Sequence, residues 1–308
     1  MSEMHSLERG KTLSSKYGNE LGGHTGKMVA PPGKISAFIV GLPGEGKSHL
    51  LQSNPAAYIF NLDSSSTVCP DPQALMFPGV DPETGRLVGD GGKDVVLTWD
   101  LVQEKVAVLK RLAVEGKPRP DTVVFDSLTA GVRLLKSWIP ANARKLGIAS
   151  EPKSEWKDLH GPAAWDLLYD TLVNIFKDLR NHGYGVFVIG HVVNAKIPLG
   201  ENQYAYKFEL TITDGFWKRL YDMFELSAVV YVEDGEEEKT TEVKTSVRGV
   251  EKTEVRKVKV RARKHYLAVQ KLDLAGIVKT RVKLPDRIEL PETGAWAAFE
   301  KVYVDCSK

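Results

Sequence analysis

The sequence predicts an α/β fold in which helices cover a twisted, mostly parallel sheet and a β-hairpin extension follows at the C-terminus. Short, continuously apolar runs alternate with segments whose apolar residues recur at helical spacing. Strands of that composition are buried on both faces, as in a parallel sheet between two layers of helices. After residue 232 the segments become strongly charged with alternating apolar residues, which is typical of a hairpin.

The elements follow from local patterns. The apolar runs that we expect to form strands are, in chain order, 35–40, 57–60, 95–97, 122–125, 186–189 and 227–232. Asp100 is expected to cap the helix that follows the third run. A longer helix carries its apolar face along 165–179 and is expected to end near Gly183. The Pro-, Gly- and Asp-rich stretch 70–92 predicts a long loop between the second and third apolar runs.

Composition divides the chain into three parts. Residues 1–33 are rich in Gly, Ser and charge, which predicts a flexible N-terminal arm. Docking of this arm on a neighbouring subunit is an alternative that the sequence leaves open. Residues 34–232 are expected to form the α/β core, and residues 233–308 a β-rich extension packed on it.

The extension has an unusual distribution of charge. An acidic run at 236–238 leads into two segments that are expected to turn near 248–249. In the second segment Lys and Arg alternate with apolar residues from Lys257 to Arg263, which places four cations on one face of a strand.

Length and composition are those of an ordinary globular protein. The chain has 308 residues, of which 42% are hydrophobic and 27% charged, and its formal net charge is +2. Any affinity for nucleic acid must therefore come from local patches. Cys69 and Cys306 match no metal-binding spacing and predict a reducing compartment. Because no apolar run suits a membrane span or a signal peptide, we expect a cytoplasmic protein without a membrane partner.

The segment GLPGEGKS at Gly41–Ser48 fits the phosphate-loop pattern G-x-x-x-x-G-K-[ST]. It follows an apolar, strand-like run and precedes a helix-compatible segment, which is the context that the pattern requires. A glycine-rich turn that matches by chance is the alternative, and this context argues against it. In this motif the Lys47 ammonium reaches the β- and γ-phosphates and the Ser48 hydroxyl binds Mg²⁺. The residues expected to contact the nucleotide are Gly41, Leu42, Pro43, Gly44, Glu45, Gly46, Lys47, Ser48 and His49.

Three other predicted strands end in polar residues, and ligands bind at the carboxyl ends of strands in open α/β sheets. Asp126 is expected to bind Mg²⁺ opposite Ser48, with a turn cap as the alternative. Asp63 is a candidate for orienting the attacking water, with a helix or turn cap as the alternative. His191 is a candidate sensor of the γ-phosphate, with a satisfied histidine at a sheet edge as the alternative.

The order and spacing of GLPGEGKS, YIFNLD, TVVFDSLT and VFVIGHV resemble the RecA/KaiC-like ATPase core, and in particular a phage-encoded group described as nucleotide-binding or single-strand annealing proteins. The resemblance spans 34–232 and extends more weakly to 278–285. It implies a RecA-like sheet, ATP and Mg²⁺ as ligands, and the cytoplasm of an infected bacterial host as the location. Asp63 stands where RecA proteins have a catalytic Glu, and His191 where RecA has Gln.

The resemblance also implies a homo-oligomer in which ATP lies between subunits and basic residues of a neighbour complete the site. Lys279 and Arg281 match that position loosely, and Arg281 is the candidate for stabilising charge on the γ-phosphoryl group. A solvated charge on a surface strand is the alternative.

In the RecA-like family, DNA contacts come from loops after the strands that end at Asp126 and His191. These loops are expected here at 130–162 and 192–213, and both mix Lys and Arg with aromatic residues. Aromatic rings stack on bases and cations pair with phosphates, which suits single-stranded DNA. An ordinary polar loop is the alternative for each. The basic strand at 257–263 is a second candidate.

The leading hypothesis is an ATP-hydrolysing, RecA-like protein that acts on single-stranded DNA in phage recombination, annealing or replication, with hydrolysis stimulated by DNA. A regulatory or scaffold protein that binds nucleotide with little turnover is the alternative. A small-molecule kinase is disfavoured, because no Arg-rich lid or acceptor pocket is evident in the sequence.

Overall fold

The computed structural model describes residues 30–64, 73–81, 83–89, 92–159, 162–200, 203–211, 214–247, 250–269 and 279–307. The chain divides into two units, Met1–Ala30 and Pro31–Lys308, and the second contains every element below. Nearly all of the predicted N-terminal arm lies outside the described residues, as does Cys69.

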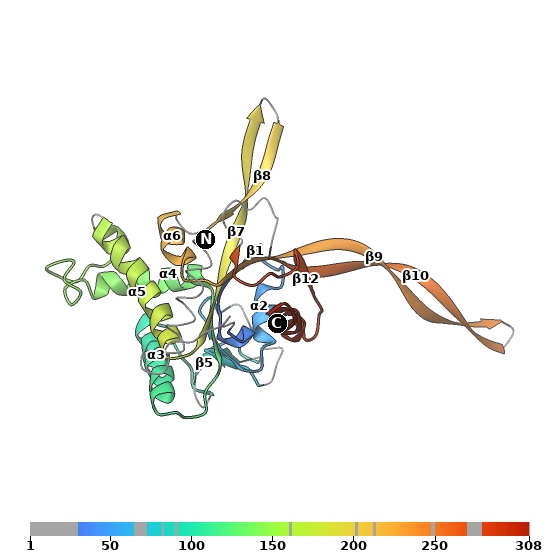
Figure 1. Cartoon of the computed structure of the whole chain (residues 1–308), viewed down its shortest axis with the longest axis horizontal. Helices are drawn as coiled ribbons and strands as arrows, with labels where there is room; N and C mark the ends of the chain where they lie inside the picture. Colours follow the sequence, from blue (N-terminus) through green and yellow to red (C-terminus); the bar gives the residue numbers. More distant parts are fainter. Residues whose placement is uncertain are drawn as a thin grey trace, which may run out of the picture. The chain divides into compact units, whose positions relative to one another are not determined.

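The core is one sheet with the strand order β12-β10-β9-β1-β7-β6-β2-β3 (Figure 1). From β9 to β3 every neighbouring pair is parallel, whereas β10 and β12 join antiparallel. The predicted α/β fold with a mostly parallel sheet is confirmed. The strands of this sheet are β1 (Ser36–Gly41), β2 (Ala57–Asn61), β3 (Leu75–Phe77), β6 (Thr122–Asp126), β7 (Gly185–Gly200), β8 (Gln203–Leu210), β9 (Leu226–Val247), β10 (Val250–Ala268), β11 (Lys279–Thr280) and β12 (Arg287–Leu290).

Helices cover both faces of the sheet (Figure 1). The helices are η1 (Pro32–Lys34), α2 (Lys47–Gln52), α3 (Trp99–Val114), α4 (Leu128–Ala141), η3 (Trp156–Asp158), α5 (Pro162–Asn181), α6 (Asp214–Tyr221) and α7 (Ala295–Ser307). On β7, Val186 and Val188 belong to the apolar core under α3, α4 and α5. Phe187 points to the other face, where its ring centroid lies 5.5 Å from that of Trp296 on α7. The strand is therefore apolar throughout because both of its faces are buried.

Two local predictions are wrong. The run Val95–Leu97 forms no strand, and Val96 is 83% exposed because no neighbouring element covers it. Asp100 does not cap α3. Thr98 is the cap, and its hydroxyl accepts a hydrogen bond from the Leu101 amide at 3.3 Å. The Asp100 carboxylate instead accepts a hydrogen bond from the Trp138 indole at 2.7 Å.

The stretch expected to be a long loop, 70–92, contains short strands in its described part. Leu75–Phe77 forms β3 at the edge of the main sheet, and β4 (Gly79–Val80) pairs with β5 (Leu87–Val88). The prediction missed these strands because they are only two or three residues long. The Pro and Gly residues around them are the residues that indicate a loop.

The C-terminal extension begins with the predicted hairpin. β9 and β10 pair in antiparallel register from Val229↔Ala268 to Val247↔Val250, and the turn itself lies outside the described residues. The register pairs Arg263 with Asp234, Arg261 with Glu236, and Lys259 with Glu238. The side chains of residues 235–262 lie outside the described residues, so DNA binding by this basic strand stays a prediction.

The segments expected to be DNA-binding loops are partly regular in structure. The segment 130–162 begins inside helix α4, and 192–210 forms a hairpin in which β7 and β8 pair from Val192↔Leu210 onward. Helix and hairpin satisfy backbone hydrogen bonds that an irregular loop of that length would leave to water.

The close approach of η1 to β7 provides a test of the fold. A Cβ atom at Gly185 would lie 2.1 Å from the Gly33 carbonyl oxygen, which belongs to the backbone and cannot rotate away. We expect Gly185→Ala to lower the free energy of unfolding by about 2–3 kcal/mol through overpacking. Urea unfolding followed by circular dichroism measures the change.

Gly215→Ala is the matched control, because a Cβ at Gly215 would meet no atom within 4 Å. It should change the free energy of unfolding by less than about 1 kcal/mol. Equal effects of the two substitutions would contradict the packing described for Gly185.

Candidate active site

The phosphate loop connects the end of β1 to the start of α2. Gly44 and Gly46 have φ angles of 80° and 92°, which glycine adopts without strain. The Leu42 amide donates to Glu45 Oε2 at 2.7 Å, so the loop is closed by its own side chain. A Cβ at Gly41 would lie 2.3 Å from the Val230 carbonyl oxygen of β9. Both the curvature of the loop and its contact with the sheet therefore require glycine.

Lys47 is held inside this loop. Its side chain is buried, at 4% exposure, and its Nζ donates to the Leu42 carbonyl oxygen at 2.6 Å. Burial lowers the pKa of Lys47, because removing the ammonium from water disfavours its charge. The carboxylates of Glu45, Asp126 and Asp63 act in the opposite direction. An ammonium fixed in this way is oriented to pair with a phosphate oxygen.

Asp126 is the last residue of β6, which is separated from β1 by β7. It is 2% exposed, and burial raises its pKa to about 6, although the hydrogen bond from Ser48 opposes the shift. Its Oδ2 atom is buried and has no hydrogen-bond partner among the described residues. A hydroxyl and an orphaned carboxylate oxygen in contact are the ligand types that Mg²⁺ prefers, so Ser48 and Asp126 fit the predicted ion.

Asp63 lies just beyond β2, whose last residue, Asn61, pairs with Asp126. Its carboxylate influences the pKa values of Lys47, Asp126 and His191, which brings it into the same cluster. Asp63 also makes a further interaction within the protein. Its position therefore suits the predicted role of orienting water at the phosphates.

His191 on β7 pairs with Gly41, the first residue of the phosphate loop. Burial lowers the pKa of His191, and the Lys47 and Arg133 charges lower it further. The imidazole is therefore neutral at pH 7, and its buried Nδ1 has no hydrogen-bond partner among the described residues. A neutral ring with an unused nitrogen can donate to, or accept from, a group that arrives at the loop.

Arg281 lies at the other end of the sheet. Its amide donates to the Glu225 carbonyl oxygen at 3.1 Å, next to Leu226, which pairs with Ala37 near the start of β1. The phosphate loop follows the end of β1, so Arg281 does not reach the site of its own chain. Its side chain is exposed. A contribution of Arg281 to a neighbouring subunit stays a prediction, and the side chain of Lys279 lies outside the described residues.

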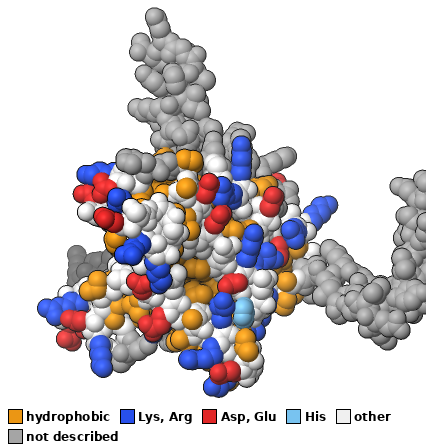
Figure 2. All heavy atoms as spheres, turned by 90° about the vertical axis from the view of Figure 1, so that its left-hand side faces the viewer, with side chains coloured by type: hydrophobic (Ala, Val, Ile, Leu, Met, Phe, Trp, Pro, Cys, Tyr) orange, Lys and Arg blue, Asp and Glu red, His pale blue; other side chains and the backbone are white. Residues whose placement is uncertain are grey.

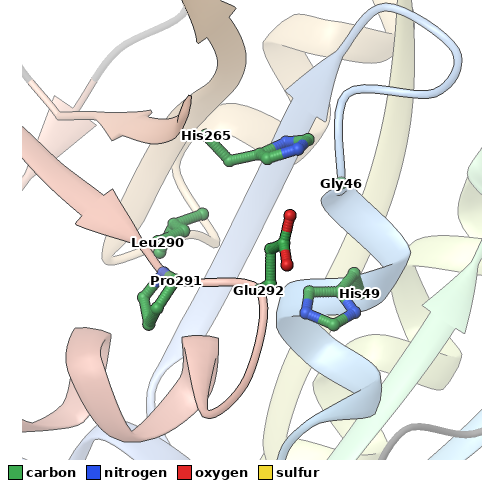
Figure 3. Close-up of a pocket in the computed structure, with 6 residues that line it drawn as sticks. All are labelled: Gly46, His49, His265, Leu290, Pro291 and Glu292. Carbon is green, nitrogen blue, oxygen red and sulfur yellow. The ribbon is translucent and has the colours of Figure 1, made fainter. Parts of the chain in front are cut away.

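The structure adds His265, which the sequence did not single out. His265 on β10 is 220 positions from Glu45, and its Nδ1 lies 3.0 Å from the Glu45 carbonyl oxygen. A pocket of about 160 Å³ opens beside this contact (Figure 3). It is lined by Gly46, His49, His265, Leu290, Pro291 and Glu292. A contact between residues so far apart leaves no local signal in a sequence.

A second pocket, of about 140 Å³, lies between α4, α5 and α6. We call it the aromatic pocket, and it is lined by Thr129, Val132, Lys136, Trp165, Tyr169, Thr211 and Phe216. The Lys136 Nζ lies 4.5 Å from the centroid of Trp165, and the rings of Tyr169 and Phe216 stack at 4.3 Å. Figure 2 shows the face that carries α4 and α5, where apolar side chains lie among Lys and Arg.

Comparison with protein families now identifies the domain. A family model described as an AAA domain matches residues 33–262, which is more than half of the chain. The chain belongs to this AAA-domain family. The AAA-domain chain is therefore a nucleotide-binding P-loop ATPase, as its phosphate loop predicts. Membership of the phage-encoded RecA/KaiC-like subgroup stays a prediction. A search of curated proteins found no match.

No helix in the described part of the chain is long and apolar enough to cross a bilayer.

The raised pKa of Asp126 predicts how stability changes with pH. The pKa of Asp126 is about 6 in the folded protein, whereas its ordinary value is 3.8. Between pH 3.8 and 6 the folded state therefore binds more protons than the unfolded state. The free energy of unfolding of the nucleotide-free protein should therefore fall as pH rises from about 4 through 6. Asp126→Asn should remove this part of the slope, and urea unfolding at a series of pH values measures it.

Asp222→Asn is the matched control, because Asp222 is exposed. It should keep the slope of the wild-type protein. A slope that Asp126→Asn leaves unchanged would show that the Asp126 carboxyl is not the buried acid described above.

Proposed function

We propose that this AAA-domain protein hydrolyses ATP and acts on single-stranded DNA, in recombination, annealing or replication of phage DNA. The observation that carries the proposal is a short connection between the nucleotide site and the aromatic pocket. The Thr129 and Thr211 hydroxyls are 3.1 Å apart, and both residues line that pocket. Thr129 follows the strand that ends at Asp126, and Thr211 donates to the His191 carbonyl oxygen at 3.1 Å.

At the nucleotide site each residue has a distinct task. The Lys47 ammonium neutralises charge on the transferred phosphoryl group, and Asp63 orients the attacking water. The neutral His191 imidazole donates to a γ-phosphate oxygen and loses that partner after hydrolysis. Ser48 and Asp126 would hold Mg²⁺, which would supply further positive charge at the phosphates.

The aromatic pocket suits a nucleobase. Trp165 lies between Trp156 and Tyr169, with ring centroids 5.1 and 5.6 Å away. The Lys136 ammonium lies within 6 Å of both Trp rings, so it can pair with a phosphate beside a base stacked there. Stacking tolerates any base, which is what a protein that anneals or coats arbitrary sequences needs.

Coupling between the two sites follows from the same contacts. A shift of His191 when it gains or loses the γ-phosphate moves its carbonyl oxygen, to which Thr211 is bonded. Thr211 in turn contacts Thr129 on α4, the helix that also carries Lys136. ATP and DNA then bias one shared set of elements, and each changes the affinity for the other.

A nucleotide-binding scaffold with little turnover is the second candidate. Asp63 favours it, because its side chain is one methylene shorter than the Glu implied by the RecA-like resemblance. A base placed farther from the water abstracts its proton less effectively. Slow hydrolysis with ATP-dependent association of subunits would support the scaffold.

DNA stimulation of ATP hydrolysis tests the leading function. We expect single-stranded DNA to raise kcat several-fold, and Lys47→Ala to abolish hydrolysis with or without DNA. Lys136→Gln should leave the basal rate unchanged and weaken the stimulation, because it removes the cation beside the Trp rings. Steady-state phosphate release at increasing DNA concentration gives both quantities.

Lys177→Gln is the matched control, since Lys177 is an exposed cation on α5 outside the aromatic pocket. It should retain full stimulation. A wild-type protein that hydrolyses ATP at the same rate with and without DNA, and gives no gel shift at low salt, would contradict the proposal.

The subunit interface has a separate test. If Arg281 reaches the ATP of a neighbouring subunit, Arg281→Ala should bind ATP normally and hydrolyse it roughly 10³-fold more slowly. Lys283→Ala, two residues away and also exposed, should hydrolyse ATP at the wild-type rate. Unchanged turnover in Arg281→Ala would exclude this role.

A further inference from the structure

The pocket in Figure 3 borders the phosphate loop directly. Gly46 is the last loop residue before Lys47, and His49 lies in the first turn of α2, so both are next to the place expected for the phosphates. A nucleotide bound there must extend its nucleoside end away from the loop. The pocket provides a hollow of about 160 Å³ at that point, which is enough for part of a nucleoside.

One side of the pocket comes from the C-terminal extension. His265, Leu290, Pro291 and Glu292 all follow residue 262, where the match to the AAA-domain family ends. Pairing of His265 with Leu290 between β10 and β12 brings them together. The family resemblance therefore says nothing of this part of the site, and the assignment depends on the residues of this chain.

The chemistry of the pocket is suited to a nucleoside. Leu290 and Pro291 provide apolar contact for a base or for the carbon atoms of a ribose. The Glu292 carboxylate can only accept hydrogen bonds. Phosphates offer it no proton and repel its charge, whereas ribose hydroxyls and the amino group of a base are donors.

We propose that this pocket binds the nucleoside end of ATP and that Glu292 accepts a hydrogen bond from it. The inference rests on the proposed function, in that it takes the phosphate loop to hold ATP. Glu292 points into the space beside Gly46 and His49 (Figure 3). It is exposed, and the structure shows it no ion pair or hydrogen bond with any described residue. Its carboxylate is thus available to a ligand.

A consequence is that the extension forms part of the nucleotide site. His265 contacts the loop through the Glu45 carbonyl oxygen, and a Cβ at Gly46 would lie 2.9 Å from His265 Nδ1. β10, which carries His265, is also one arm of the long hairpin. The nucleoside then binds between the P-loop core and the base of this hairpin, so occupancy of the site is sensed by both.

The test compares affinities for three nucleotides in the presence of Mg²⁺, measured by calorimetric titration of the full chain. The nucleotides are ATP, dATP, which lacks the 2′-hydroxyl, and ITP, which lacks the amino group. We expect Glu292→Ala to weaken ATP binding roughly tenfold, the typical effect of losing a hydrogen bond to a charged group. Because Glu292 is exposed, the substitution should leave the fold intact.

The three nucleotides identify the donor. If Glu292 binds the 2′-hydroxyl, the variant loses the wild-type preference for ATP over dATP. If it binds the amino group, the variant loses the preference for ATP over ITP. A tenfold loss for all three nucleotides assigns the bond to the 3′-hydroxyl. Each of these results supports the inference.

Glu300→Ala is the matched control, since Glu300 is an exposed acid on α7 outside the pocket. It should bind all three nucleotides as the wild type does. If Glu292→Ala binds all three with wild-type affinity while Lys47→Ala does not bind them, the pocket assignment fails and the proposed function stands. If the wild-type protein itself binds no nucleotide, both fail.

Discussion

The burial of one ammonium among several carboxylates is the constraint on which this structure depends. Lys47 is 4% exposed and Asp126 is 2% exposed, and both carry charges that water would otherwise stabilise. Their separation in the chain means that β1 and β6 must end at the same edge of the sheet, which parallel strands achieve. The fold therefore maintains a costly cluster of charge that a triphosphate and its cation can complete.

The same edge explains how the site can communicate with the rest of the protein. β6 ends at the cluster and leads into α4, whereas β7 passes the cluster at His191 and continues into the hairpin with β8. Thr129 and Thr211 tie these continuations together above the sheet. On the other side, β9 and β10 bring His265 against the phosphate loop. Lys47 and Asp126 are thus connected to the aromatic pocket and to the C-terminal extension by short stretches of chain and by hydrogen bonds.

Local patterns in the sequence were sufficient for the parallel sheet and for the grouping of the candidate site residues. The phosphate loop is a contiguous motif, and the rule that ligands bind at strand ends singled out Asp63, Asp126 and His191, which the fold brings near this loop. Their roles stay predictions. What failed depended on tertiary contacts. Val95–Leu97 looks like a strand until its exposure is known, and His265 joins the loop across 220 positions. The register of the hairpin likewise depends on both strands together.

We have proposed that the buried Lys47 binds the phosphates of ATP. Thermal unfolding of the wild type and of Lys47→Met, each with and without ATP and Mg²⁺, tests it most directly. ATP at 100 times its Kd should stabilise the wild-type protein by about 2.7 kcal/mol and so raise its Tm. Lys47→Met should fold and show no such rise. An equal rise in Tm for both proteins would contradict the account, because ATP would then bind elsewhere.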